Sequence, residues 1–136
     1  MTLIDSNILI DLLIDDPKWS DWSLVHLEQA SLRGPLVIND IVYGETSTRY
    51  PSIEDFESAL TVANITIAPM PRTALFLAGK AFTQYRRAGG IRTGVLADFF
   101  IGAHAAVDAL PLLTRDARRY RSYFPTVALI TPENEG

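Results

Sequence analysis

Short apolar runs alternate along the chain with longer segments in which apolar residues recur every three or four positions. The runs at residues 2–4, 36–38, 65–67, 111–114 and 127–130 each predict a buried strand. The spacing between them predicts helices near residues 8–14, 20–32, 53–62, 73–88 and 98–109, with shorter helices starting near residues 40 and 116. This alternation is typical of an α/β fold with a mostly parallel sheet of four to five strands flanked by helices.

Proline and glycine residues separate these elements without dividing the chain. Pro17, the pair Gly34 and Pro35, and the pair Gly89 and Gly90 all fall where an element is expected to end. We find no internal repeat beyond the alternation and no linker. We therefore expect a single domain over residues 1–131 and a flexible polar tail at residues 132–136.

The composition is that of a folded protein, because 48% of the 136 residues are hydrophobic. No apolar run reaches the ~20 residues that cross a bilayer, and the first residues lack the basic stretch of a signal peptide. We expect a cytoplasmic protein that does not contact a membrane. Since the chain has no cysteine, a metal ion must be held by oxygen ligands or by His26 and His104.

The charges are unevenly distributed. A formal net charge of −4 argues against a protein that coats nucleic acid. The arginines nevertheless gather late in the chain, in two groups that comprise Arg86, Arg87, Arg92, Arg115, Arg118, Arg119 and Arg121. Arginine suits planar contacts with phosphate groups, and each of these residues fits a solvated helix surface equally well.

Four acidic residues stand at the ends of predicted strands or in the first turns of the helices that follow: Asp5, Glu45, Asp98 and Asp116. In a parallel α/β sheet these places converge on one edge. Carboxylates ~4 Å apart repel by about 4 kcal/mol per pair at an effective dielectric near 20, so such a cluster takes up a proton or a cation. Mg²⁺ and Mn²⁺ prefer oxygen ligands and bind together with phosphate, so the pattern predicts phosphate chemistry in which a metal activates water.

Other polar residues are expected to lie outside this site. Asp108 is ten positions beyond Asp98 on the same helix, which corresponds to about 15 Å. His104 is turned away from the Asp98 face by the helical repeat, so we expect a structural role for it. Asp11 is expected to be a solvated charge.

Other interpretations stay open at this point. Asp5 alone fits a helix entry, Asp116 a helix N-cap and Glu45 a solvated helical residue. A receiver-type or phosphatase-type enzyme also places acids around Mg²⁺, although it usually needs a lysine near the site. The chain has only Lys18, expected in a loop, and Lys80, expected in the middle of a core-packing helix.

Four stretches of the sequence resemble the PIN-domain ribonucleases, in particular the VapC toxins of type II toxin–antitoxin modules. They are TLIDSNILID at residues 2–11, NDIVYGE at 39–45, LADFFIGAHAA at 96–106 and LLTRDARRY at 112–120. The first, third and fourth stretches are quite specific in combination. The resemblance covers essentially the whole chain and implies a PIN-like three-layer fold.

The resemblance also implies roles for particular residues. The acidic metal-binding set of the family is matched by Asp5, Glu45, Asp98 and Asp116. Asn7 matches the asparagine that typically orients the first aspartate, and Thr114 matches the hydroxyl residue two positions before the last acid. Asn39 stands where many relatives have serine or threonine, and a hydrogen-bonding role is expected for it.

The function implied is that of a Mg²⁺- or Mn²⁺-dependent endoribonuclease toxin that leaves a 5′-phosphate and a 3′-hydroxyl. A cognate antitoxin is expected to cover the acidic pocket and to provide the only link to DNA. A homodimer is expected from the family and from the surplus of apolar helix surface around Trp22 and Phe56. The alternative is a catalytically silent PIN-like module that binds RNA or a partner, although such a module would ordinarily have lost one or more of the acids.

The basic residues around the acids are expected to bind the RNA backbone. This set comprises Arg86, Arg87, Arg92, Arg115, Arg118 and Arg119. For Arg115 the sequence leaves a second possibility open, which is pairing with a carboxylate of the cluster.

Overall fold

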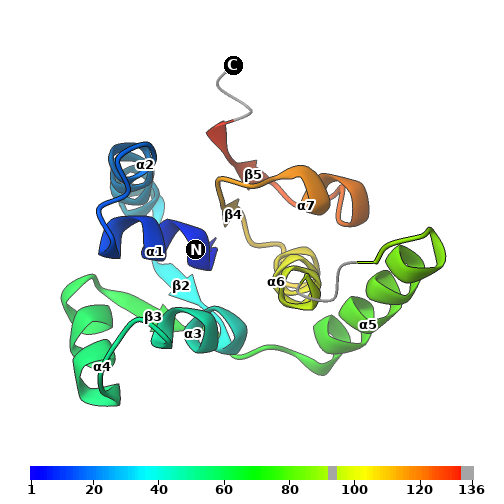
Figure 1. Ribbon diagram of the computed structural model, residues 1–136, viewed down its shortest axis with the longest axis horizontal. Helices are drawn as coiled ribbons and strands as arrows, with labels where there is room; N and C mark the ends of the chain where they lie inside the picture. Colours follow the sequence, from blue (N-terminus) through cyan, green and yellow to red (C-terminus); the bar gives the residue numbers. More distant parts are fainter. Residues whose placement is uncertain (92–94, 133–136) are drawn as a thin grey trace.

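A parallel sheet of five strands lies between two layers of helices in the computed structural model, which describes residues 1–91 and 95–132 (Figure 1). The strands are β1 (Thr2–Ile4), β2 (Leu36–Ile38), β3 (Ile65–Ile67), β4 (Leu112–Leu113) and β5 (Leu129–Ile130). Their order in the sheet is β3-β2-β1-β4-β5, and every neighbouring pair is parallel. The first strand of the chain is therefore the central strand, with Leu3 paired to Val37 on one side and to Leu112 on the other.

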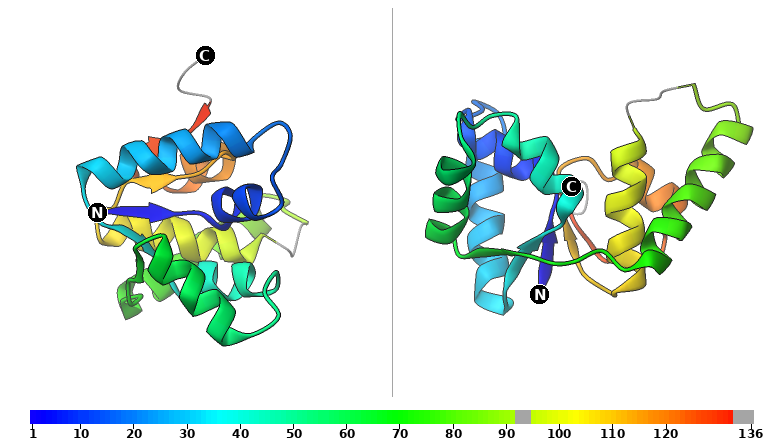
Figure 2. Two further views of the ribbon diagram at one scale, coloured as in Figure 1. Left: turned by 90° about the vertical axis from the view of Figure 1, so that its left-hand side faces the viewer. Right: turned by 90° about the horizontal axis from the view of Figure 1, so that it is seen from below.

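The helices of the described residues are α1 (Ser6–Leu13), α2 (Ser20–Arg33), α3 (Asp40–Ser47), α4 (Ile53–Val62), α5 (Arg72–Arg87), α6 (Leu96–Val107) and α7 (Arg118–Tyr123). The right-hand view of Figure 2 shows α1, α2 and α4 on one side of the sheet and α5, α6 and α7 on the other. Helix α3 contacts α1 in one layer and α6 in the other. It follows β2 directly, so it closes the sheet at the carboxyl ends of the central strands.

The core is built from the strands and from the small residues of α6. Leu3 and Ile4 of β1 are fully buried, as a central parallel strand requires. A Cβ atom on Gly102 in α6 would lie 2.4 Å from the Phe124 ring and 3.0 Å from the Tyr120 ring. Glycine at this position therefore allows α7 to pack directly on α6.

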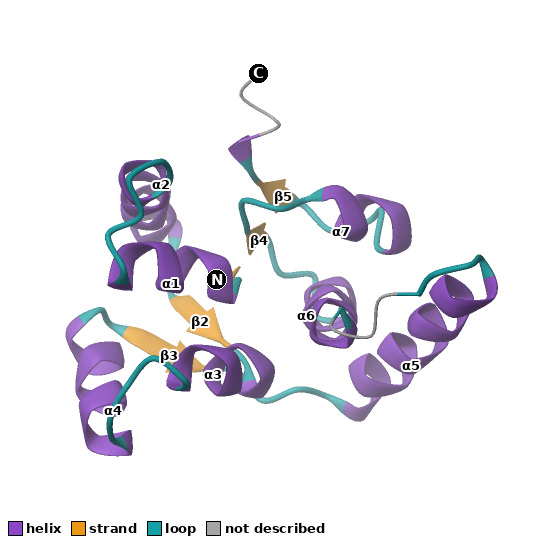
Figure 3. Cartoon of the chain, viewed as in Figure 1, coloured by secondary structure: helices purple, strands orange, loops and turns teal. Residues whose placement is uncertain are grey.

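The predicted α/β fold and its parallel sheet are confirmed (Figure 3). The last two strands are shorter than predicted, with two residues each. Asn39 caps α3 by accepting a hydrogen bond from the Val42 N–H at 3.0 Å. The interpretation of Asp116 as an N-cap is wrong, because Ala117 occupies that position and no side chain caps α7.

None of the helices in residues 1–91 and 95–132 has the length and apolar character needed to span a membrane. Arg92 and most of the predicted tail, residues 133–136, lie outside the described part of the chain.

Candidate functional site

Asp5 stands at the carboxyl end of the central strand, where its side chain is almost completely buried. The hydroxyl groups of Thr114 and Tyr120 both donate hydrogen bonds to its Oδ2 atom, each at 2.8 Å. Burial raises the pKa of Asp5, and these two hydrogen bonds oppose the rise. Thr114 follows the neighbouring strand β4, and Tyr120 lies on α7, so the sheet order and the α6–α7 packing together fix this carboxyl group.

Glu45 comes from α3 and is linked to Asp5 through a serine. The Ser6 hydroxyl donates to Glu45 Oε1 at 2.9 Å and lies 3.4 Å from Asp5 Oδ1. Burial raises the pKa of Glu45, and the negative charge of Asp5 raises it further, against the effect of the Ser6 hydrogen bond. The two carboxylates are thus close enough to repel each other.

Asp98 lies in the first turn of α6 and joins the same group. Burial raises the pKa of Asp98 to about 6, and the charges of Asp5 and Glu45 add to this rise. Arg119 opposes the rise, because its Nη1 atom donates to Asp98 Oδ2 at 2.6 Å. Three predicted acids therefore form one electrostatic unit at the carboxyl edge of the sheet.

The fourth predicted acid, Asp116, is exposed beside this group. Its backbone N–H donates to Thr114 Oγ1 at 3.2 Å, which ties the loop to the hydroxyl that holds Asp5. The Asp116 side chain lines a pocket of about 250 Å³ together with Arg118, Arg119 and residues of α5 and α7. Asp116 is not among the charges that raise the pKa of Glu45 or Asp98.

The donor chemistry of the three coupled acids fits a hard divalent ion such as Mg²⁺ or Mn²⁺. They supply only oxygen ligands, and their mutual repulsion favours a cation among them. In the described arrangement, however, no three acidic or histidine side chains of residues 1–91 and 95–132 are placed so as to hold one ion. Asp98 is neutralised by Arg119 instead.

Asn7 supports the site through Thr114 rather than through Asp5. Its Nδ2 atom donates to Thr114 Oγ1 at 3.3 Å, and its Oδ1 atom accepts from the Arg115 N–H at 3.4 Å. The predicted hydroxyl Thr114 is fully buried between Asn7 and Asp5. Asn7 therefore orients Asp5 indirectly, through the Thr114 hydroxyl.

Asn39 makes the hydrogen bonds expected of it, but away from the acids. Its Nδ2 atom lies 3.1 Å from His104 Nδ1, and His104 Nε2 lies 3.1 Å from Asp108 Oδ2. This chain of hydrogen bonds, buried at Asn39 and His104, joins the start of α3 to the end of α6. His104 and Asp108 are structural, as the helical spacing predicts.

The predicted RNA-binding arginines separate into two kinds. Arg115 forms a two-pronged ion pair with Asp11, at 2.7 Å from Nε to Oδ2 and 3.0 Å from Nη2 to Oδ1. Asp11 is 1% exposed, so the expectation that it is a solvated charge is wrong. Arg115 pairs with a carboxylate outside the acidic cluster, which removes it from the residues that we place on RNA. Arg86, Arg87 and Arg118 are exposed at the ends of α5 and α7.

Sequence reasoning missed Ser6 and Tyr120. Ser6 adjoins Asp5 at a helix start, and its position there was the only available signal. Tyr120 ends the stretch LLTRDARRY, yet nothing in the local pattern indicates that its hydroxyl reaches a residue 115 positions earlier.

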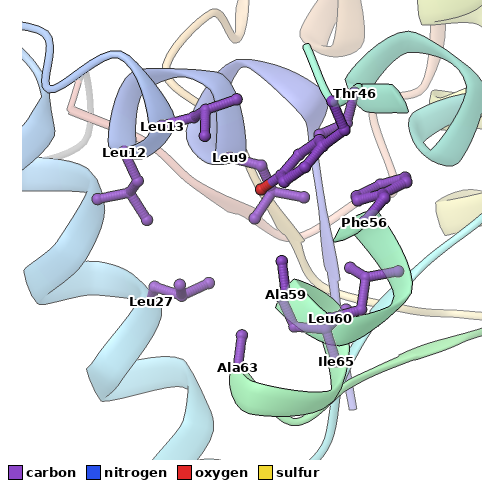
Figure 4. Close-up of a pocket in the computed structure, with 11 residues that line it drawn as sticks. Leu9, Leu12, Leu13, Leu27, Thr46, Phe56, Ala59, Leu60, Ala63 and Ile65 are labelled. Carbon is purple, nitrogen blue, oxygen red and sulfur yellow. The ribbon is translucent and has the colours of Figure 1, made fainter. Parts of the chain in front are cut away.

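A second feature of the molecule is an apolar groove of about 230 Å³, shown in Figure 4. Its walls are residues of α1, α2, α4 and neighbouring segments: Leu9, Leu12, Leu13, Leu27, Thr46, Tyr50, Phe56, Ala59, Leu60, Ala63 and Ile65. Thr46 follows Glu45 in the sequence, and its buried Oγ1 atom has no hydrogen-bond partner among the described residues. Leu13 is 42% exposed at the rim, so the groove is open to solvent.

Comparison with known proteins gives a family and a fold. The family model described as the PIN domain matches residues 2–125. No curated protein matches the sequence significantly. Among solved structures, VapBC2 from Rickettsia felis bound to a DNA fragment from its promoter is similar with a TM-score of 0.71 and 19% identity, over 96% of this chain and 97% of that chain.

Two further structures agree with this result. VapBC-1 from nontypeable Haemophilus influenzae has a TM-score of 0.70 and 19% identity, over 96% of each chain. A toxin–antitoxin complex from Klebsiella pneumoniae has a TM-score of 0.64 and 23% identity, over 97% of this chain and 98% of that chain. At these identities the similarity establishes the fold.

Proposed function

Because this chain belongs to the PIN domain family, we propose that it is a metal-dependent endoribonuclease that acts as the VapC-type toxin of a toxin–antitoxin pair. The observation that carries the proposal is the coupling of Asp5, Glu45 and Asp98 at the carboxyl edge of the sheet. Mg²⁺ or Mn²⁺, once bound there, would supply an activated water and stabilise charge on the phosphate oxygens.

Different residues would bind the ion and hold its ligands in position. Asp5, Glu45 and Asp98 would hold it, and the exposed Asp116 stands beside them on the loop before α7. Thr114 and Tyr120 fix one oxygen of Asp5, which leaves its other oxygen facing Ser6 and Glu45.

The RNA backbone would lie across the basic residues near this edge. Arg118 and Arg119 line the pocket beside Asp98 together with the Tyr85 ring. Arg86 and Arg87 follow Tyr85 at the exposed end of α5. Such a surface offers charges for phosphates and an aromatic ring for a base.

We assign the apolar groove to the antitoxin partner. Thr46, which lines the groove, follows Glu45 in α3, so a segment bound in the groove would lie against the helix that carries Glu45. Its apolar lining suits an apolar segment of the partner. DNA contacts would then belong to the antitoxin, and the cytoplasmic location of the toxin stays a prediction.

Pairing with a second copy of the chain also stays a prediction. Phe56 itself is 2% exposed and stacks on Tyr50, but Ile53 and Val62 on the same helix are 64% and 88% exposed. Exposed apolar side chains also occur on α5, where Phe76 is 69% exposed and Leu75 is 41% exposed.

The rival functions receive less support. Lys18 lies over the Trp19 ring and Lys80 over the Phe76 ring, so neither joins the carboxylates as a phosphoacceptor enzyme would require. A catalytically silent binding module would not require three coupled acids. The experiment below distinguishes such a module from an enzyme.

Purified chain without a partner is incubated with total bacterial RNA, with and without Mg²⁺ or Mn²⁺, next to the Asp98→Asn variant. We expect discrete, metal-dependent fragments that Asp98→Asn reduces on the order of 100-fold or more. Asp21→Asn is the matched control, because Asp21 is also an acid in the first turn of a helix but is exposed on α2. Equal cleavage by both variants would contradict the proposal.

A further inference from the structure

The side chain of Arg119 forms an ion pair with Asp98, one of the three coupled acids. Arg119 Nη1 lies 2.6 Å from Asp98 Oδ2, which is the length of a strong charge-assisted hydrogen bond. The two side chains are 20% and 33% exposed, so water weakens their attraction only in part. The Arg119 guanidinium also lies 5.8 Å from the centre of the Tyr85 ring. Two contacts therefore hold it at the entrance to the acids.

This contact occupies an oxygen that a hard metal ion needs. A guanidinium and a divalent cation bound at one carboxylate repel each other, and Mg²⁺ accepts only oxygen ligands in a strict geometry. At the other two acids, Thr114 and Tyr120 donate to Asp5 Oδ2 and Ser6 donates to Glu45 Oε1, so Asp98 would have to complete the set of ligands. No three acids in the described residues converge on one point while Asp98 is paired in this way.

The Arg119 guanidinium borders a second site that it could occupy, the pocket beside α7. Arg119 lines the pocket of about 250 Å³ that also contains Arg118 and the exposed carboxylate Asp116. In that pocket Arg119 would face solvent and any phosphate group bound near Arg118. Nothing on Asp98 would then exclude a metal ion.

We propose that Arg119 is an internal counter-ion that competes with the divalent metal for Asp98 and is released into the neighbouring pocket when the metal binds. The inference rests on the metal dependence proposed above. It makes Arg119 a positioning residue with two places, on Asp98 without metal and on the RNA backbone with metal. Because coupling between two ligands is reciprocal, a phosphate that binds the released Arg119 also strengthens metal binding.

The test is direct titration of Mn²⁺ into the purified chain by calorimetry at pH 8, with no RNA present. Wild type, Arg119→Met and Arg118→Met are compared. Both variants remove one positive charge from the same turn of α7, but only Arg119 contacts an acid of the group. We expect Arg119→Met to bind Mn²⁺ roughly three- to tenfold more tightly than Arg118→Met, as expected for loss of a partly buried ion pair.

A second readout is thermal unfolding of the same proteins. Without metal, Arg119→Met should melt at a lower temperature than Arg118→Met, because its acids have lost their counter-ion. Saturating Mn²⁺ should raise the melting temperature of Arg119→Met by more than that of Arg118→Met, since tighter binding to the native state gives more stabilisation. If Arg119→Met does not fold, Arg119→Gln serves in the same comparison.

The outcomes separate this inference from the proposed function. If wild type binds Mn²⁺ and Arg119→Met binds it no more tightly than Arg118→Met, then Arg119 does not compete with the metal, although the proposed metal site is supported. If none of the three proteins binds Mn²⁺, the metal-dependent function itself is wrong.

Discussion

At the scale of single residues, the position of Asp5 depends on two hydroxyl groups that come from the other end of the chain. Thr114 and Tyr120 share its Oδ2 atom. Burial disfavours the charged form of Asp5, and each hydrogen bond restores part of that loss. The charged form of Asp5, at the end of the central strand, is therefore favoured by groups outside the acidic set.

Replacement of Tyr120 by phenylalanine tests this dependence. Tyr120→Phe should raise the pKa of Asp5 further and destabilise the fold by about 1–2 kcal/mol, since a buried charged acceptor loses a donor. Urea unfolding measures the stability and RNA cleavage at pH 7 measures the activity. Both the free energy of unfolding and the cleavage rate should be lower than in wild type. Tyr123→Phe is the control, because Tyr123 packs on the Phe99 ring. Equal behaviour of the two variants would rule out a role for the Tyr120 hydroxyl.

The raised pKa of Asp98 predicts how stability depends on pH without metal. The pKa rises from 3.8 to about 6 because of burial and the charges of Asp5 and Glu45, with Arg119 opposing. The folded chain then binds the proton more tightly than the unfolded chain. This stabilisation is complete below pH 3.8 and is lost as the pH rises through 6.

Thermal unfolding of the metal-free protein between pH 4 and pH 8 measures this effect against Asp98→Asn. We expect Asp98→Asn to lose less stability than wild type over this range, by about 1 kcal/mol after solvent screening of the partly exposed carboxyl. Parallel curves for the two proteins would show that Asp98 does not titrate in this way.

The residues that sequence could predict were those fixed by local position. Asp5 was predicted because it follows an apolar run, and the sheet edge then brings it near Glu45 and Asp98. The Asp11–Arg115 pair joins residues 104 positions apart, and no periodic pattern carries that information. The same limit applies to Tyr120, whose partner is decided by how α7 packs.

At the scale of elements, the packing of α7 on α6 connects the fold to the site. Helix α7 carries Tyr120 and Arg119, and its approach to α6 depends on the bare backbone of Gly102. Alanine at this position must push Phe124 or Tyr120 away. The hydroxyl on Asp5 would move with that displacement.

We therefore expect Gly102→Ala to destabilise the protein by roughly 1–3 kcal/mol, as overpacking of a core does. Gly79→Ala is the matched control, because Gly79 lies inside α5 with nothing within 4 Å of the added atom. The control should stabilise by about 0.5–1 kcal/mol through helix propensity. Urea unfolding of both variants measures the difference, and a neutral Gly102→Ala would contradict the close packing.

The elements themselves were predictable because helix and strand patterns are local. Each predicted strand and helix is present, and the parallel sheet follows from their alternation. Helix ends were less predictable. Asn39 is a cap because its side chain accepts a hydrogen bond from the Val42 N–H, whereas Asp116 stands one residue before the cap position of α7 and does not cap the helix.

At the scale of the whole molecule, the apolar groove and the acidic group share no residue and should be separable by mutation. Leu13→Glu places a charge at the rim of the groove without touching the acids. We expect the variant to cleave RNA like wild type but to bind a co-expressed antitoxin at least ~10-fold more weakly, since a hot-spot loss costs about 2 kcal/mol.

Leu32→Glu is the control for this experiment, because Leu32 is 87% exposed on α2 and does not line the groove. Affinity is measured on the purified complex by calorimetry or surface binding. Unchanged affinity of Leu13→Glu for the antitoxin would place the partner elsewhere on the surface.

The central strand of the sheet is separated along the chain from one of its two neighbours by most of the domain. In the order of synthesis β1 precedes β4, although the two strands lie side by side in the sheet. The two hydroxyl groups that hold Asp5 follow it by 109 and 115 positions, and such distant contacts form late in folding. During synthesis Asp5 is therefore made long before the groups that hold it exist.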